Sequence, residues 1–320
     1  MQADMSSLVE TIGYVFGLVA LGYLTGWLRL LRDDAGEVMT SFAVTIAVPL
    51  LLFRTMSNAQ FGEGLPWGLW ITYFTAIAIT WTVSQLSLVH IFKRDGRAGV
   101  VAGLAGSFSN LVLLGIPFML GVHGQAAFEQ LSLIVTIHLP IMTGVSILLY
   151  NLLDPQKKGS FSLLSVLKGL LQRMLTNPLI IGILGGLIWR AGGLELPSLA
   201  ERLVDSLANV AGPVALFAMG LGLRSYGIKG DVRPAILIAF YKQMLMPAIA
   251  LGLAIALDLS TITAIAVVTA ASFPCGVNPY LIASQFGTGQ RLASNAMTIG
   301  TALAFLTTAF WIAVTASVFS

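Results

Sequence analysis

Long apolar runs separated by short polar segments make up most of this chain. Ten runs approach the roughly 20 residues that an α-helix needs to cross the hydrocarbon core of a bilayer. The pattern predicts ten transmembrane helices, at residues 8–28, 38–56, 67–92, 99–122, 128–153, 177–191, 199–223, 234–257, 261–286 and 293–318. The segment 154–176 between the fifth and sixth spans begins with a polar linker and continues as an amphipathic stretch, typical of a helix lying along the membrane surface. The expected fold class is an all-α polytopic membrane protein.

Composition agrees with a protein whose main partner is the lipid bilayer. Of the 320 residues, 57% are hydrophobic and only 10% are charged, a balance typical of polytopic membrane proteins. The net charge of +3 indicates no nucleic-acid partner. Cys275 is the single cysteine, so an intrachain disulfide is excluded.

The basic residues are distributed unequally between the two sides of the predicted membrane. With the N-terminus outside, 13 Lys and Arg residues fall on the cytoplasmic side and 3 on the outer side, while Lys242 lies within a span. Cytoplasmic loops carry the excess of Lys and Arg in membrane proteins. The count predicts that both termini lie on the outer side of the cell's inner (cytoplasmic) membrane.

Short matches at a constant offset indicate an internal repeat. Residues 49–53 resemble residues 213–217 at an offset of 164, and both segments begin with proline. At an offset of 165, Ser107-Phe108 matches Ser272-Phe273, and Gly124 matches Gly289. The chain therefore divides into a first five-span repeat, 1–153, and a second, 177–320, joined by the cytoplasmic linker 154–176.

A repeat of five spans must enter the membrane upside down in its second copy, because five is odd. Two prolines five residues apart, Pro274 and Pro279, interrupt the ninth span, since each removes a backbone donor and clashes with the preceding turn. The fourth span contains Gly115-Ile116-Pro117, so the proline-broken spans are fourth in their halves, and Asn110–Pro117 is the predicted partner of the break in the ninth span. Inverted repeats with broken helices near mid-membrane are typical of secondary transporters. A simple proline kink without a ligand is the alternative reading of the ninth span.

Five short motifs in order resemble the auxin efflux carrier family. They are Asn110 with Gly115-Ile116-Pro117, the Pro274-x-Gly276-x-x-Pro279 segment, residues 47–51, Asn177-Pro178, and residues 186–189. The family includes plant auxin exporters and bacterial permeases for malonate or malate, and the resemblance covers nearly the whole chain. It implies a bile-acid-symporter/NhaA-like fold with crossed broken helices. Spans 1, 2, 6 and 7 would form a scaffold that also makes a homodimer, and spans 3–5 and 8–10 a transport domain that moves in an elevator-like manner.

The resemblance also implies a substrate site at the crossing. Asn110 matches the crossover asparagine of the family and is the first choice for a substrate ligand, with a helix–helix hydrogen bond as the alternative. The expected substrate-binding residues are Ser109, Asn110, Pro117, His138, Pro274, Cys275, Gly276, Val277, Asn278 and Pro279. Asn278 departs from the family, which more often has an apolar residue there. It either adds a substrate contact or satisfies a carbonyl freed by Pro279.

Two ionisable residues within spans are candidates for coupling or for attracting an anion. His138 occupies a place where plant members carry a polar residue, and it can change charge near neutral pH. A neutral histidine bonded to the backbone is the alternative. Lys242 matches a basic position of the family, and it either attracts an anion or extends to the inner surface. Pro49, Gly115, Pro213 and Pro247 are expected to act structurally, as hinge or crossover residues.

Chemistry at the crossing favours an anionic substrate, because helices that begin there direct N–H groups and the positive end of the helix dipole at it. No Asp or Glu falls deep in a span, so the coupling ion, H⁺ or Na⁺, stays open. We expect no cofactor, no metal and no catalytic residue, since the chain has no HExxH motif and no paired aspartates within spans. The sequence predicts a secondary transporter of small organic anions such as carboxylates or auxin-like acids. A membrane sensor on the same fold, binding without net transport, is the alternative.

Overall fold

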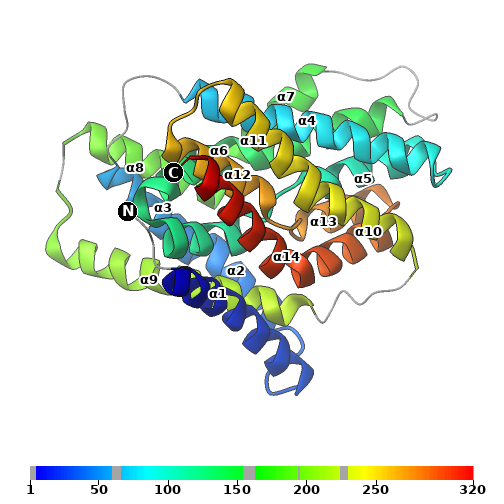
Figure 1. Ribbon diagram of the computed structural model, residues 1–320. Helices are drawn as coiled ribbons and strands as arrows, with labels where there is room; N and C mark the ends of the chain where they lie inside the picture. The colour runs from blue at the N-terminus through cyan, green and yellow to red at the C-terminus, as the bar shows by residue number, and fades with distance from the viewer. Residues whose placement is uncertain (1–4, 60–65, 154–162, 194, 224–229, 320) are drawn as a thin grey trace. The chain divides into compact units, whose positions relative to one another are not determined.

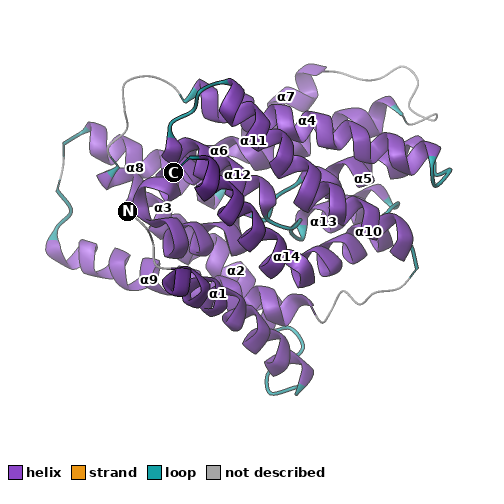
Figure 2. Cartoon of the chain, viewed as in Figure 1, coloured by secondary structure: helices purple, strands orange, loops and turns teal. Residues whose placement is uncertain are grey.

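The computed structural model describes residues 5–59, 66–153, 163–193, 195–223 and 230–319. All regular elements in these ranges are helices, and none is a strand (Figure 2). The all-α prediction is confirmed. Six helical segments in this part of the chain are long and apolar enough to cross a membrane, and two shorter apolar helices accompany them. The amphipathic stretch forms α7 (Leu163–Thr176), whereas the polar linker at 154–160 lies outside the described residues.

The chain divides into two compact units. Unit 1 comprises Met1–Pro66, Leu111–Thr136 and Met174–Ser225. Its helices are α1 (Met5–Trp27), α2 (Ala35–Phe42), α3 (Val48–Asn58), α8 (Pro178–Ala191), α9 (Ser198–Leu223) and the first part of α6 (Ile116–Leu152) (Figure 1). All four spans expected to form the scaffold lie in this unit.

Glycines let the helices of unit 1 approach one another at backbone distance. A Cβ atom on Gly220 of α9 would lie 2.0 Å from the carbonyl oxygen of Val19 on α1. A Cβ on Gly182 of α8 would lie 2.3 Å from the carbonyl oxygen of Pro49 on α3. Small residues at such contacts are how helices associate closely in membranes. The pairs α1–α9 and α3–α8 therefore pack with no room for a side chain at these points.

Unit 2 comprises Trp67–Asn110, Ile137–Arg173 and Tyr226–Ser320. It contains α4 (Trp67–His90), α5 (Gly96–Ser107), the second part of α6, α10 (Val232–Phe240), α11 (Met246–Ala256), α12 (Thr261–Ser272), α13 (Asn278–Phe286) and α14 (Gln290–Val318) (Figure 1). Helix α6 changes direction at Gly124, whose φ of 77° lies in the left-handed region that glycine adopts without strain. This turn separates the fourth predicted span from the fifth.

Two of the predicted spans are broken in the middle. Helix α5 ends at Ser107, the chain is extended at Phe108, and helical structure resumes with a π-helical turn, η2 (Leu111–Gly115). Helix α12 ends at Ser272, the chain is extended at Phe273, and α13 begins at Asn278. The second interruption lies at the predicted proline segment. The first lies at 108–110, before Gly115 and Pro117, where η2 passes directly into α6.

Prolines elsewhere in the spans do not break them. Pro49 and Pro247 are the second residues of α3 and α11, and each follows a π-helical turn, η1 (Ala43–Ala47) or η5 (Tyr241–Leu245). A proline leaves the carbonyl four residues earlier without its usual donor. For Pro247 that carbonyl belongs to Gln243, and the Trp311 indole Nε1 donates to it at 2.8 Å. A side chain from α14 thus completes the backbone hydrogen bonding of this span.

Helix bounds recur along the chain at the same offset of 165 as the sequence matches. Adding 165 to both bounds of α5 gives both bounds of α12, and adding it to the start of α4 gives the start of α10. Gly124 and Gly289, which are related by this offset, both have φ in the left-handed region, at 77° and 74°. The repeated sequence motifs therefore coincide with repeated breaks and turns of the backbone.

Candidate functional site

The two interruptions meet inside unit 2. The backbone N–H of Asn110, in the first break, donates to the carbonyl oxygen of Pro274, in the second, at 2.9 Å. A Cβ atom on Gly276 would lie 3.2 Å from Cγ of Asn110, so the Asn110 side chain packs directly against the second break. Asn110 itself is buried. Asn110 and residues 274–276, which the sequence predicts in one substrate site, are therefore in contact.

Both positively and negatively polarised helix ends lie at the contact between the two breaks, which we call the crossing. Helices α5 and α12 end there, and the last carbonyls of a helix lack partners within it and carry partial negative charge. Helix α13 begins there, and the first N–H groups of a helix carry partial positive charge. Asn278 and Pro279 are the first two residues of α13. Because Pro279 has no N–H, a carboxylate bound at the beginning of α13 would accept from the backbone N–H of Asn278.

Lys242 is turned into unit 2 and does not reach its surface. The side chain is 1% exposed, and its Nζ atom donates to the carbonyl oxygen of Ala271 at 2.6 Å. Ala271 is in the last turn of α12, where a cation is stabilised by the negative end of the helix dipole. Lys242 thus connects the π-helical turn η5 to the helix that ends at the second break.

Gln243, which sequence reasoning missed, lies beside Lys242 and is also buried. Its Nε2 atom donates to the Gly300 carbonyl at 2.9 Å and to the Thr307 hydroxyl at 3.0 Å. Its Oε1 atom has no hydrogen-bond partner among the described residues. A Cβ on Gly300 would lie within 3.4 Å of both Gln243 Oε1 and Pro274 Cβ, which puts this oxygen close to the second break. The sequence feature that could have identified Gln243 is an amide side chain next to a lysine within an apolar run.

Aromatic and hydroxyl groups surround the first break. The His138 ring lies edge-on to that of Phe108, with ring centroids 4.5 Å apart, and 5.6 Å from that of Tyr73. Both ring nitrogens of His138 are buried and have no hydrogen-bond partner in the described part of the chain. The hydroxyls of Tyr73 and Ser109 lie near each other without full hydrogen-bond geometry. Buried polar atoms normally have partners, so this cluster contains unused hydrogen-bonding capacity. Sequence reasoning missed Tyr73.

The remaining predicted residues have simpler surroundings. Cys275 is buried in an apolar cluster that includes Ala105 and Ala296, and Val277 packs against the same cluster. Pro117 belongs to unit 1, where a Cβ on Gly212 would lie 3.2 Å from it. The structure therefore groups Ser109, Asn110, His138 and residues 274–276 around the breaks, whereas Pro117 packs against α9.

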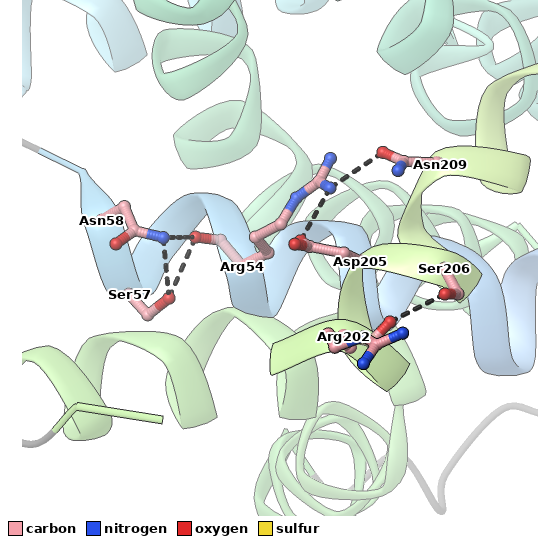
Figure 3. Close-up of polar contacts among 7 residues, drawn as sticks. All are labelled: Arg54, Ser57, Asn58, Arg202, Asp205, Ser206 and Asn209. Carbon is pink, nitrogen blue, oxygen red and sulfur yellow. Dashed lines mark hydrogen bonds and ion pairs between the residues drawn. The ribbon is translucent and has the colours of Figure 1, made fainter. Parts of the chain in front are cut away.

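A second polar region lies in unit 1. The Arg54 guanidinium donates to Asp205 at 3.0 Å and to Asn209 at 2.9 Å, which connects α3 to α9 (Figure 3). A cavity of about 410 Å³ lies beside these residues, and Glu195, Glu201 and Trp189 also line it. Its three carboxylates outnumber its single guanidinium, which is already paired. The cavity is therefore electrostatically unfavourable for an anion, in contrast to the crossing.

No buried carboxylate accompanies the crossing. Lys242 is the single Lys, Arg, Asp or Glu among the buried residues that the structure describes. Within the same residues, no group of three His, Cys, Asp or Glu side chains is arranged to hold a metal ion. The one Lys, Arg, Asp or Glu side chain buried near the second break is thus basic.

In this helical protein, two broken helices meet inside one unit. The side chains of Asn110 and Lys242 lie at the helix ends there. These are features of a membrane transport protein. The chain matches the family described as "Membrane transport protein" over residues 7–312. It belongs to that family, the auxin efflux carriers, and is a multi-pass membrane transporter.

Several named proteins are similar to the chain over much of its length. A Rhizobium meliloti protein named "Putative malonate transporter" is 30% identical over 91% of this chain and 91% of its own. The Auxin efflux carrier component 8 of Arabidopsis thaliana is 22% identical over 95% of this chain and 96% of its own. The mouse Lysosomal cholesterol signaling protein is 25% identical over 64% of this chain but only 24% of its own.

Proposed function

We propose that this chain is a secondary transporter that moves small organic anions across the inner membrane and binds them where the two breaks cross. The observation that carries the proposal is the contact between Asn110 and the second break, through the Pro274 carbonyl and Gly276. The relative named for malonate, similar over nearly its whole length, supports a carboxylate as the transported group.

Binding of the carboxylate follows from the polarity of the crossing. The backbone N–H of Asn278 at the start of α13 and the side-chain amide of Asn110 are donors, and a carboxylate is an acceptor at both oxygens. Phe108 and Val277, which flank the breaks, supply apolar surface for the remainder of an organic acid. The site thus pairs a small number of oriented donors with apolar walls, as small-molecule sites generally do.

Transport in this proposal occurs by an elevator-type movement of one domain against another. The recurrence of helix bounds at a constant offset supports ten spans arranged as two inverted repeats, and the distribution of Lys and Arg supports outer termini. Unit 1 contains α1, α3, α8 and α9, which supports a separate scaffold. We propose that this scaffold also forms a homodimer. Both breaks and the ligand would travel with unit 2.

The second candidate function is a membrane sensor that binds a ligand without net transport. It is favoured by the partial similarity to a mouse protein named for cholesterol signaling. That similarity spans only a quarter of the mouse chain, whereas unit 2 contains the two broken helices that are typical of secondary transporters. A sensor would be stabilised by its ligand yet show no flux.

Reconstituted protein can separate these functions. Purified protein is screened for thermal stabilisation by malonate and other mono- and dicarboxylates, and the acids that stabilise it are tested for flux into proteoliposomes. We expect saturable flux of at least one acid that also stabilises the protein. Stabilisation without flux would establish the sensor, and neither effect across the panel would refute organic-anion transport.

A further inference from the structure

The carbonyl end of α12 is an unusual place for a fixed charge. Helix α12 stops at Ser272 because the following residue is extended, so its last carbonyls cannot bond to a continuing helix. Lys242 Nζ donates to one of them, that of Ala271, from a side chain that is 1% exposed. The ammonium group is therefore held inside the protein by a helix end rather than by a carboxylate.

Cations at such helix ends have a known part in transporters built from inverted repeats. There, the carbonyl ends of broken helices and unwound backbone carbonyls coordinate the coupling ion, while helix N-termini face the anionic substrate. Lys242 places one positive charge at the carbonyl end of α12. A mobile cation entering the same position would meet a like charge at close range and is disfavoured.

The other half of the chain has no matching group. At the offset of 165 that relates the two repeats, Lys242 is matched by Ile77, which is buried. The neighbouring Gln243 is likewise matched by an alanine, Ala78. The charge is therefore a feature of the second break alone, and repetition of the fold does not explain it.

We propose that the Lys242 ammonium group is a resident cation of the crossing, fixed at the carbonyl end of α12 in the position that a coupling metal ion would otherwise take. It keeps the end of α12 neutralised through the transport cycle and balances the charge of a bound anion. Transport of organic anions, on which this inference rests, then requires no Na⁺. Lys242 acts as a positioning residue for the second break rather than as a direct substrate ligand.

Chemical rescue tests the inference directly. Lys242→Ala removes the ammonium and leaves space, which ethylammonium, supplied as the membrane-permeant amine, can fill. We expect wild-type melting temperature and flux to be the same in Na⁺ and in choline. Lys242→Ala is expected to lose flux by about tenfold or more, the order of effect of a hydrogen bond to a charged group. Ethylammonium should raise both its melting temperature and its flux saturably.

The controls separate charge from volume and from folding. Ethanol, a neutral molecule of the same size, should restore neither property, and Lys242→Arg should retain more flux than the neutral Lys242→Met. Lys168→Met, on the exposed side of α7, should behave as wild type. Rescue by ethanol equal to that by ethylammonium, or Na⁺-dependent flux in the wild type, would overturn the inference. The melting-temperature arm needs no transported acid, so it distinguishes failure of this inference from failure of the proposed function.

Discussion

The two breaks share a backbone design but differ in the chemistry around them. Each follows a helix of 12 residues that ends in serine. The first break contains Asn110 and is surrounded by the neutral rings of Phe108, His138 and Tyr73. The second has Cys275 where the first has Asn110, and Lys242 of η5 donates to Ala271 of the helix that ends at it. In our account, the first break supplies the side chain that recognises the substrate, Asn110, and the second supplies the start of α13 and the fixed charge.

Moving the charge to the first repeat should produce the largest effect. Ile77→Lys places a lysine at the buried position that matches Lys242, where no acceptor has been identified that corresponds to the Ala271 carbonyl. An uncompensated buried charge costs about 3–5 kcal/mol. We expect a large loss of folded protein, measured as the yield and the melting temperature in detergent. Ile91→Lys, at a highly exposed position just past α4, is the control and should be tolerated. Equal stability of the two variants would show that the repeats are chemically interchangeable.

The next largest effect should distinguish Asn110 from its repeat partner. Asn110→Ala removes a donor to the substrate carboxylate and should weaken binding by about 1.5–3 kcal/mol, which is tenfold or more. Cys275→Ala, at the matching position in the second break, should change affinity less than twofold. Binding is measured by titration of the purified variants with the transported acid. If the cysteine variant lost more affinity than the asparagine variant, the assignment of recognition to the first break would be wrong.

The hydrogen bond that completes η5 offers a third comparison. Trp311→Phe keeps an aromatic ring but leaves the Gln243 carbonyl without its donor, and a buried group without its partner costs about 1–3 kcal/mol. We therefore expect a lower melting temperature. Trp67→Phe, at the exposed start of α4, is the matched control and should leave the melting temperature unchanged. Identical melting temperatures for the two variants would contradict the role of Trp311.

Gly276→Ala should have the smallest effect. The added methyl would lie 3.2–3.4 Å from side-chain atoms of Asn110, which must move slightly to make room. We expect a loss of substrate affinity of about 1 kcal/mol, at the lower end of the cost of overpacking. Gly252→Ala adds a methyl to α11 where nothing lies within 4 Å, and it should bind substrate as the wild type does. Unchanged affinity in both variants would show that the Asn110 side chain does not contact the ligand.

Much of the fold followed from local sequence, whereas the surroundings of the breaks did not. Each apolar run predicted a helix, and Pro274 and Pro279 located the second break, because proline acts on its own backbone. The first break has no proline within it. The sequence placed it at Asn110–Pro117, and the structure has it at 108–110, so the prediction included the break but extended past it. Tyr73, Gln243 and Trp311 were missed because their contacts join residues that are far apart in sequence. Such contacts depend on how helices pack, which the hydrophobic pattern of one chain does not specify.

The most direct test of the central claim is an experimental structure with a transported carboxylate bound. The acid that gives the largest thermal stabilisation is the one to use. The account predicts its carboxylate within hydrogen-bond distance of the Asn110 amide and of the Asn278 N–H at the start of α13, with no metal ion beside Lys242. A carboxylate bound instead in the cavity next to Arg54, with the crossing unchanged, would contradict it.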